Sequence, residues 1–317
     1  MRKLILSSLF ALMFAPSIMA ADAPAKKILD EAGICLNGNC KAIAASPDGS
    51  AYVLMKDCRL VHVDTDGTIT EIKVPLNKEI KTMDDYFCDM VVDTKAAYFC
   101  GYNYSSVMAL DFNDPKELKP LTVKYDNKEI KPLRISRASD GWTLADDSNT
   151  YKIDKTGNAT VLPENSQIVL DEADNAVISV YPYEEEGKTV YPGKLLNQDK
   201  TVKWTAPTPH QPKVVMGIEY LGFDSDNKRD VYLVNSASGD MDVKFTIYAV
   251  DKGNKIVSKR NIPLSNIETL MRFCKLSSDG SILAVYAEPN DPDGKVLLKR
   301  FELKNQTPEE QEIESKG

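Results

Sequence analysis

The feature that most constrains the fold of this chain is a short turn-and-strand unit found near both ends. The sequence SPDGSAYVL at residues 46–54 returns as SSDGSILAV at residues 277–285, and Asp140-Gly141 before WTLAD is a fainter third copy. In each copy an Asp-Gly pair precedes a strand-forming run. Asp can accept hydrogen bonds within a turn and Gly can adopt a positive φ, so the unit predicts a tight turn followed by a strand.

Residues 40–76 show what a complete repeat contains. Four strand-like runs, CKAIAA, SAYVLMK, RLVHVD and TITEIKVPL, are separated by the breaks SPDG, DC and TDG. Four consecutive antiparallel strands in one compact stretch are typical of a propeller blade. Looser versions follow at a mean spacing of about 46 residues, close to known blade repeats. We therefore predict an all-β fold, a single β-propeller of six four-stranded blades over residues 21–304. Two β-sandwiches would explain the strands but not the recurring unit.

The two ends of the propeller are predicted to meet. The last blade shows only three clear strands before an acidic segment at 305–317, whose composition is typical of a flexible tail. A strand near residues 28–36 can complete that blade, closing the ring and covering a sheet edge. We expect Ile28–Leu36 to pair with the strand around Leu297–Leu303.

The turn sequences also resemble a known repeat. Pro47-Asp48-Gly49, and Ser278-Asp279-Gly280 without the proline, resemble the PD40-type, WD40-like repeat of TolB-type periplasmic propellers. The resemblance implies a six-bladed propeller and a periplasmic setting.

The N-terminus predicts export. Arg2 and Lys3 precede an apolar run and Ala20 precedes the expected cut, so residues 1–20 are interpreted as a secretory signal peptide. The run is shorter than the roughly 20 residues of a membrane span, and we predict no span in the mature chain. The predicted location is the periplasm, with secretion as the alternative. The net charge of −8 argues against nucleic-acid binding.

Six cysteines in an exported chain favour disulfides. Cys88 and Cys100 flank a predicted hairpin with its turn at Asp93–Ala96. Cys35 and Cys40 bracket the turn LNGN. The remaining pair, Cys58 and Cys274, would tie the two ends of the chain together.

One stretch has the spacing of a metal site. Asp224, Asp226 and Asp230 precede an apolar strand and resemble the calcium loops of FG-GAP repeats in integrin-type propellers. Oxygen donors on alternate residues suit Ca²⁺. Gly222 stands where that motif has its first carboxylate, however, and Asn227 replaces its glycine. A solvated acidic turn is therefore the favoured interpretation, with Ca²⁺ as the one cofactor that the sequence suggests.

Aromatic side chains beside turns suggest a binding rim. Rim tyrosines suit contacts with protein or sugar, although tyrosine is also an ordinary strand residue. The candidates are Tyr102, Tyr104, Tyr181, Tyr183, Tyr191 and His210.

The sequence contains no GxSxG elbow, CxxCH haem site, P-loop or dinucleotide fingerprint. We therefore predict a non-catalytic periplasmic scaffold or interaction module with a periplasmic or outer-membrane protein partner. The alternative is a metal-dependent lactonase- or sugar-hydrolase-like enzyme, with Asp89, Glu172 and Glu219 converging on a central channel. A quinone- or sugar-binding dehydrogenase is disfavoured by the scarcity of histidine and tryptophan.

Overall fold

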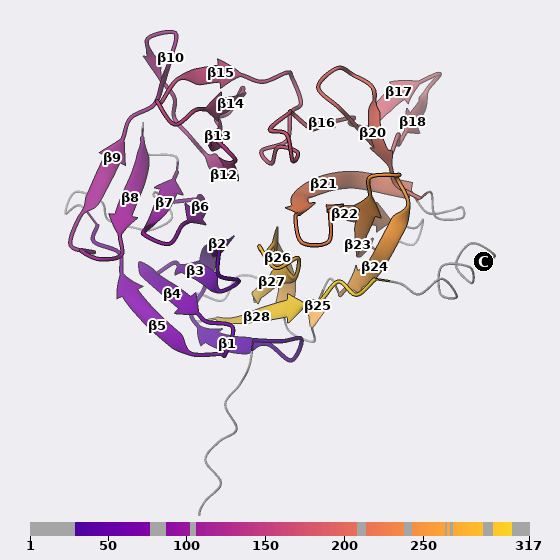
Figure 1. The fold of residues 1–317 in the computed structure, drawn as a ribbon. Helices are drawn as coiled ribbons and strands as arrows, with labels where there is room; N and C mark the ends of the chain where they lie inside the picture. Colours follow the sequence, from indigo (N-terminus) through magenta and orange to yellow (C-terminus); the bar gives the residue numbers. More distant parts are fainter. Residues whose placement is uncertain are drawn as a thin grey trace, which may run out of the picture.

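The computed structural model describes residues 29–76, 87–101, 106–207, 214–237, 243–263, 265–266, 269–287 and 294–305. Every regular element within these ranges is a β-strand. The strands form blades arranged in a ring (Figure 1), and the predicted all-β, six-bladed propeller is confirmed. No described segment forms a helix long and apolar enough to cross a membrane. The predicted signal peptide and all of the predicted tail except Asn305 lie outside the described residues.

Blades one to three are four-stranded antiparallel sheets that follow the chain order. Their strands are β2 (Cys40–Ala45), β3 (Ala51–Met55), β4 (Arg59–Val63) and β5 (Ile69–Lys73); β6 (Asp89–Val92), β7 (Ala96–Cys100), β8 (Val107–Asp111) and β9 (Leu118–Leu121); and β12 (Arg134–Ala138), β13 (Gly141–Ala145), β14 (Thr150–Ile153) and β15 (Ala159–Val161). A hairpin of β10 (Lys124–Tyr125) and β11 (Lys128–Glu129) separates the second blade from the third.

Blade four is less regular than its neighbours. Its sheet has three strands, β16 (Ile178–Ser179), β19 (Lys194–Leu196) and β20 (Val202–Thr205), and a separate hairpin of β17 (Tyr183–Glu185) and β18 (Lys188–Val190) interrupts it. The Gln167 N–H donates to the Val177 carbonyl (2.7 Å), and Ser166 forms a single bridge with Ile178. The segment around Val169 thus takes the place of an innermost strand.

Blades five and six have longer strands. Blade five contains β21 (Val214–Asp224), β22 (Arg229–Ala237), β23 (Val243–Asp251) and β24 (Ile256–Ile262); blade six contains β25 (Ser265–Asn266), β26 (Thr269–Leu276), β27 (Ile282–Ala287), β28 (Lys295–Phe301) and β1 (Ile34–Asn37). The first strand of the chain therefore belongs to the last blade.

An N-terminal strand closes the ring as predicted, but its bounds differ: β1 spans Ile34–Asn37 rather than Ile28–Leu36, and it pairs with Lys295–Leu298 rather than Leu297–Leu303. Strand β1 pairs antiparallel with β28, with Ile34 opposite Leu298 and Asn37 opposite Lys295. In Figure 1 the indigo β1 lies along the yellow β28. Ile34 and Leu36 point inward and are buried. Apolar side chains that alternate along a strand bury one face of that strand. The four-residue strand ICLN is therefore held in the ring by two buried side chains.

The two copies of the repeated turn lie side by side in the closed ring. In each copy the Asp side chain accepts two hydrogen bonds from the following serine: Asp48 from Ser50 and Asp279 from Ser281. Both turn glycines have positive φ, +84° at Gly49 and +77° at Gly280. The Ser278 hydroxyl also donates to the Pro47 carbonyl (2.9 Å), which joins one turn to the other across the closure.

The hydrophobic core lies between neighbouring blades rather than on the ring axis. Separate buried clusters fill the spaces between blades six and one, one and two, two and three, four and five, and five and six. Inner strands are consequently buried on both faces, as in β27, where all six residues are buried. This arrangement leaves the axis to the innermost strands, whose side chains decide what the channel can bind.

Candidate functional site

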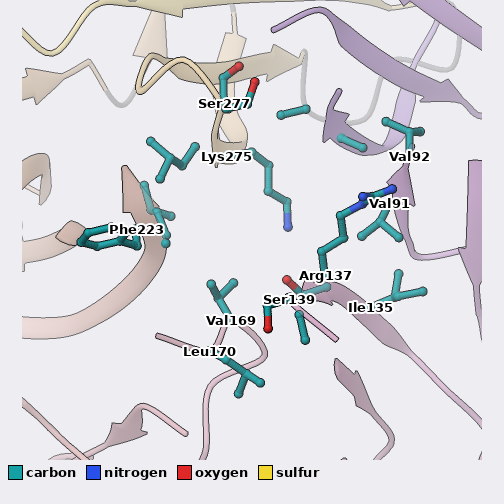
Figure 2. A pocket seen from close by; sticks show the side chains of 18 of the residues that line it. Val91, Val92, Ile135, Arg137, Ser139, Val169, Leu170, Phe223, Lys275 and Ser277 are labelled. Atoms are coloured by element: carbon teal, nitrogen blue, oxygen red, sulfur yellow. The ribbon is translucent and has the colours of Figure 1, made fainter. Parts of the chain in front are cut away.

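One end of the channel opens into a cavity of about 340 Å³, here called the channel mouth. The innermost strands of five blades, β2, β6, β12, β21 and β26, all run toward this end, and the segment around Val169 completes the wall in blade four. Apolar side chains form much of the wall, and Figure 2 shows Val91, Ile135, Val169 and Phe223 around the space. The mouth is therefore built from all six blades.

Lys275 is the charged group at the centre of the channel mouth. Its half-buried side chain extends from the end of β26 into the open space (Figure 2). Within the part of the chain that the structure describes, its ammonium makes no salt bridge and no hydrogen bond. Lys275 also lines the second cavity below, so it stands between the two halves of the channel.

The other charged side chains at the mouth are already engaged. Arg137 pairs with Asp93 (3.3 Å), and Glu172 pairs with Lys252 (3.0 Å). Asp174 pairs with Lys152 (3.2 Å) and accepts hydrogen bonds from Ser139. Asp171 accepts the N–H groups of Ala173 and Asn175 in its own turn. These contacts hold the turns of blade four against blades three and five.

The lower cavity, of about 460 Å³, holds two of the carboxylates named for an enzyme. Asp89 and Glu219 both line it, whereas Glu172 lies at the channel mouth. The buried Asp89 accepts the N–H groups of Met90 (3.0 Å) and Ile135 (3.1 Å). Glu219 lies 3.9 Å from the Arg134 guanidinium. Asp89 thus connects blade two to blade three through its hydrogen bond to the Ile135 backbone. Glu219, in blade five, lies across the channel from the Arg134 guanidinium, in blade three, and partly neutralises its charge.

The three carboxylates of the predicted calcium loop serve different partners. Asp224 is fully buried and pairs with the Arg229 guanidinium (2.8 Å). Burial favours the neutral acid, but hydrogen bonds from Asn227 and Arg229 outweigh it and hold the pKa of Asp224 below its ordinary value. Asp226 is exposed.

Asp230 accepts the Tyr220 hydroxyl (2.6 Å) and pairs with Lys203 (3.2 Å). Burial and the neighbouring Asp230 raise the pKa of Tyr220 far above its ordinary value, so this phenol acts as a donor. Among the described residues no group of three His, Cys, Asp or Glu side chains is placed to hold a metal ion. The calcium loop stays a prediction, and its carboxylates share no centre in the structure.

Half of the predicted rim residues can be placed. Tyr102, Tyr104 and His210 lie outside the described residues. Tyr181 and Tyr183 are strongly exposed, at 63% and 49% of their surface, and Tyr191 is half-buried. Tyr181 and the exposed Met216 line a small groove between blade four and the start of β21. The groove lies at the opposite end of β21 from the channel mouth. The tyrosine rim stays a prediction.

All six cysteines are described, and all six are free thiols. Cys88 and Cys100 do lie side by side: the Cys88 N–H donates to the Cys100 carbonyl (2.9 Å), and the Cys88 thiol donates to the Leu133 carbonyl (2.8 Å). The hairpin that was predicted to bring them together is present, with the Asp93 N–H donating to Ala96 across the turn.

The thiols of Cys88 and Cys100 are neighbours without a disulfide between them, and the other two predicted pairs are not neighbours in the structure. Cys58 packs in the cluster between blades one and two, whereas Cys274 packs between blades five and six. The closed ring brings blades six and one together, but these two thiols face opposite sides of that pair. Cys35 is exposed on β1, and Cys40 lies at the start of β2 in another blade.

Lys275 and Arg137 give the channel mouth its positive groups, and neither residue was predicted from the sequence. A signal was present for Lys275: it interrupts the apolar run FCKL of an innermost strand, two residues before the repeated SSDG turn. A charged residue at such a position cannot enter the core between blades and must face the axis. Arg137 occupies the equivalent end of β12.

No family profile and no curated sequence matches the chain. Solved structures do resemble it. The PQQ-bound aldose sugar dehydrogenase of Streptomyces coelicolor is 13% identical and has a TM-score of 0.50, with 86% of this chain and 97% of that chain covered. YCF48 bound to a D1 peptide is 11% identical over 88% of this chain and 100% of that chain, with a TM-score of 0.47.

The WD40 β-propeller domain of Doa1 is 14% identical over 86% of this chain and 96% of that chain, with a TM-score of 0.39. These likenesses concern the fold. A fold does not by itself indicate a function, so the function must be argued from the channel.

Proposed function

We propose that this protein is a non-catalytic binding module of the periplasm whose channel mouth holds an extended segment of a protein partner. The observation that carries this proposal is the make-up of the mouth: apolar and polar side chains from six blades surround an open cavity. The Lys275 ammonium projects into it and has no partner among the described residues. Concave pockets that combine apolar walls with placed polar groups are typical binding sites.

The engaged carboxylates support binding rather than chemistry. A general acid or a metal ligand has to be free to exchange protons or donate a lone pair. Asp89 and Asp174 instead accept hydrogen bonds that join neighbouring blades, and Glu172 is paired with a lysine. The cavity also lies at the low end of the size range of ligand pockets, which suits a chain segment better than a folded surface.

The proposal is tested by photo-crosslinking in cells. A photoreactive amino acid replaces Ser278, which is exposed at the channel mouth, or Lys119, which is exposed on the outermost strand of blade two. We expect one envelope protein to crosslink reproducibly from position 278 and not from position 119. Fractionation with and without outer-membrane permeabilisation tests the periplasmic location in the same cells.

A defined result would overturn the proposal. If position 278 yields no specific crosslink and the purified protein hydrolyses a lactone or glycoside in a manner abolished by Asp89→Asn, the enzyme alternative holds instead. That alternative is the one in which Asp89 and Glu219 act together in the lower cavity.

A further inference from the structure

We propose that the ligand of the channel mouth is a carboxylate on an extended partner segment, either its C-terminus or an acidic side chain, and that Lys275 binds it. This inference rests on the proposed function and specifies its chemistry. It starts from the Lys275 ammonium, which has no ion-pair or hydrogen-bond partner among the described residues.

The local charge pattern favours an incoming anion at Lys275. Arg137 is paired with Asp93 on the same side of the mouth, so it needs no further partner. The three acidic residues of blade four are bound to Lys252, Lys152 and backbone N–H groups. Among the described residues no group forms an ion pair or hydrogen bond with the Lys275 ammonium, so a carboxylate on a ligand can supply one.

The wall around Lys275 strengthens such a contact. Val91, Ile135 and Val169 face the space that the ammonium enters, as Figure 2 shows. An ion pair surrounded by apolar side chains is less screened than one on an open surface. Charge-assisted hydrogen bonds are also shorter and stronger than neutral ones. The same wall accepts the apolar part of a residue that carries the carboxylate.

The position of the ammonium limits what can reach it. Lys275 precedes the Ser277 turn and stands inside the ring of inner strands, where it lines both the mouth and the lower cavity. A flat protein surface cannot enter a cavity of about 340 Å³. A chain terminus or a single long acidic side chain can. The acidic turns of blade four on the opposite wall disfavour a second negative charge and orient the segment.

The experiment uses methyl-labelled protein and probes of defined charge. Hexanoate and its neutral analogue hexanamide are titrated while the methyl signals of Val91, Ile135 and Val169 are followed by NMR. We expect saturable shifts at these methyls, with hexanamide binding roughly 10- to 100-fold more weakly, as the loss of a charged hydrogen bond implies. In Lys275→Met the two probes should bind equally weakly, and Lys275→Arg should restore the preference. Lys119→Met, on an outer strand, is the matched control.

Peptides separate the two sources of the carboxylate. A peptide ending in leucine with a free or an amidated C-terminus tests a chain terminus, and an amidated peptide with an internal glutamate tests a side chain. Equal binding of acid and amide probes to the wild-type protein, or unchanged discrimination in a folded Lys275→Met variant, would overturn the inference. If the partner crosslinked from position 278 persists unchanged in Lys275→Met, the inference fails while the proposed function stands. Lys275-dependent hexanoate binding without any crosslinked partner would support carboxylate binding by Lys275 but reject a partner segment as the source of the carboxylate.

Discussion

The repeated turn contains two glycines that can be tested against each other. Gly49 and Gly280 occupy the same place in the motif, are both buried and have nearly the same positive φ. A methyl group added at Gly49 would lie 3.5 Å from the Asp279 carboxylate, an ordinary contact. The same methyl at Gly280 would lie 2.3 Å from the Asp224 carboxylate. The two substitutions therefore differ in packing and hardly at all in backbone strain.

The magnitude follows from what holds Asp224 in place. Either substitution costs roughly 1–2 kcal/mol for a non-glycine residue in the left-handed region. At Gly280 the carboxylate cannot retreat, because Arg229 and Asn227 bind it and Arg229 is itself held by the Leu303 carbonyl (2.9 Å). Overpacking costs about 1–3 kcal/mol and a broken buried ion pair costs about 3–5 kcal/mol. We expect Gly49→Ala to cost about 1–2 kcal/mol and Gly280→Ala about 3–5 kcal/mol.

The assay is urea unfolding followed by circular dichroism, with melting temperature as a second measure. For a chain of this size the difference of about 1–4 kcal/mol between the two variants corresponds to roughly 2–6 °C. A double-mutant cycle isolates the contact: in an Asp224→Ala background, Gly280→Ala should cost only the backbone term of about 1–2 kcal/mol. Equal costs for the two glycine substitutions, or an unchanged cost of Gly280→Ala without the Asp224 carboxylate, would refute the rigid contact between blades five and six.

Three further predictions follow from the closure, the buried ion pair and the thiols. Leu36→Ala should lower the free energy of unfolding in urea by about 2–5 kcal/mol, because it leaves a cavity under the closing strand. The control Cys35→Ala, at an exposed position of the same strand, should change that free energy by no more than about 0.5 kcal/mol. An unchanged free energy of unfolding in Leu36→Ala would mean that β1 is not part of the folded ring. The pKa of Asp224 in the folded protein lies below its unfolded value of about 3.8. Its contribution to stability is therefore complete above about pH 3.8 and is lost as the pH falls through the folded pKa. The stability of Asp224→Asn should consequently decline less steeply below about pH 4 than that of the wild type. Alkylation of the native reduced protein, read by peptide mass spectrometry, should label the exposed Cys35 first and the buried Cys100 and Cys274 last. Burial raises the pKa of both buried thiols and so lowers the fraction of reactive thiolate. Rapid labelling of Cys274 would contradict its place in the core.

The fold was largely predictable because its signals are local. The strands of blade one begin and end within a few residues of the breaks at SPDG, DC and TDG. Asp-Gly turns and apolar runs depend on neighbours in the chain, and the recurrence of the unit predicted the ring. Blade four was harder to read because its innermost segment is not a regular strand and a hairpin divides its sheet.

Residue roles were less predictable than the strands that carry them. The spacing of Asp224, Asp226 and Asp230 resembles a calcium loop, yet Asp224 faces Arg229 in the core and Asp230 faces Tyr220 and Lys203. Lys203 lies on β20, in another blade, so no local pattern could reveal the pairing. The Cys58–Cys274 bridge failed for a similar reason, since neighbouring blades in a ring need not present their thiols to each other.

The sequence by itself determined the repeating strand unit, the turns that separate the strands and the use of an N-terminal strand to complete the last blade. Each of these depends on the backbone preferences and apolar alternation of a few consecutive residues. Only the tertiary structure decided that Lys275 enters a cavity without a partner among the described residues, while Arg137 and the acidic turns of blade four have partners. The channel mouth takes residues from six blades spread over most of the chain, and the charge state of such a site is set by contacts that form only when the ring closes.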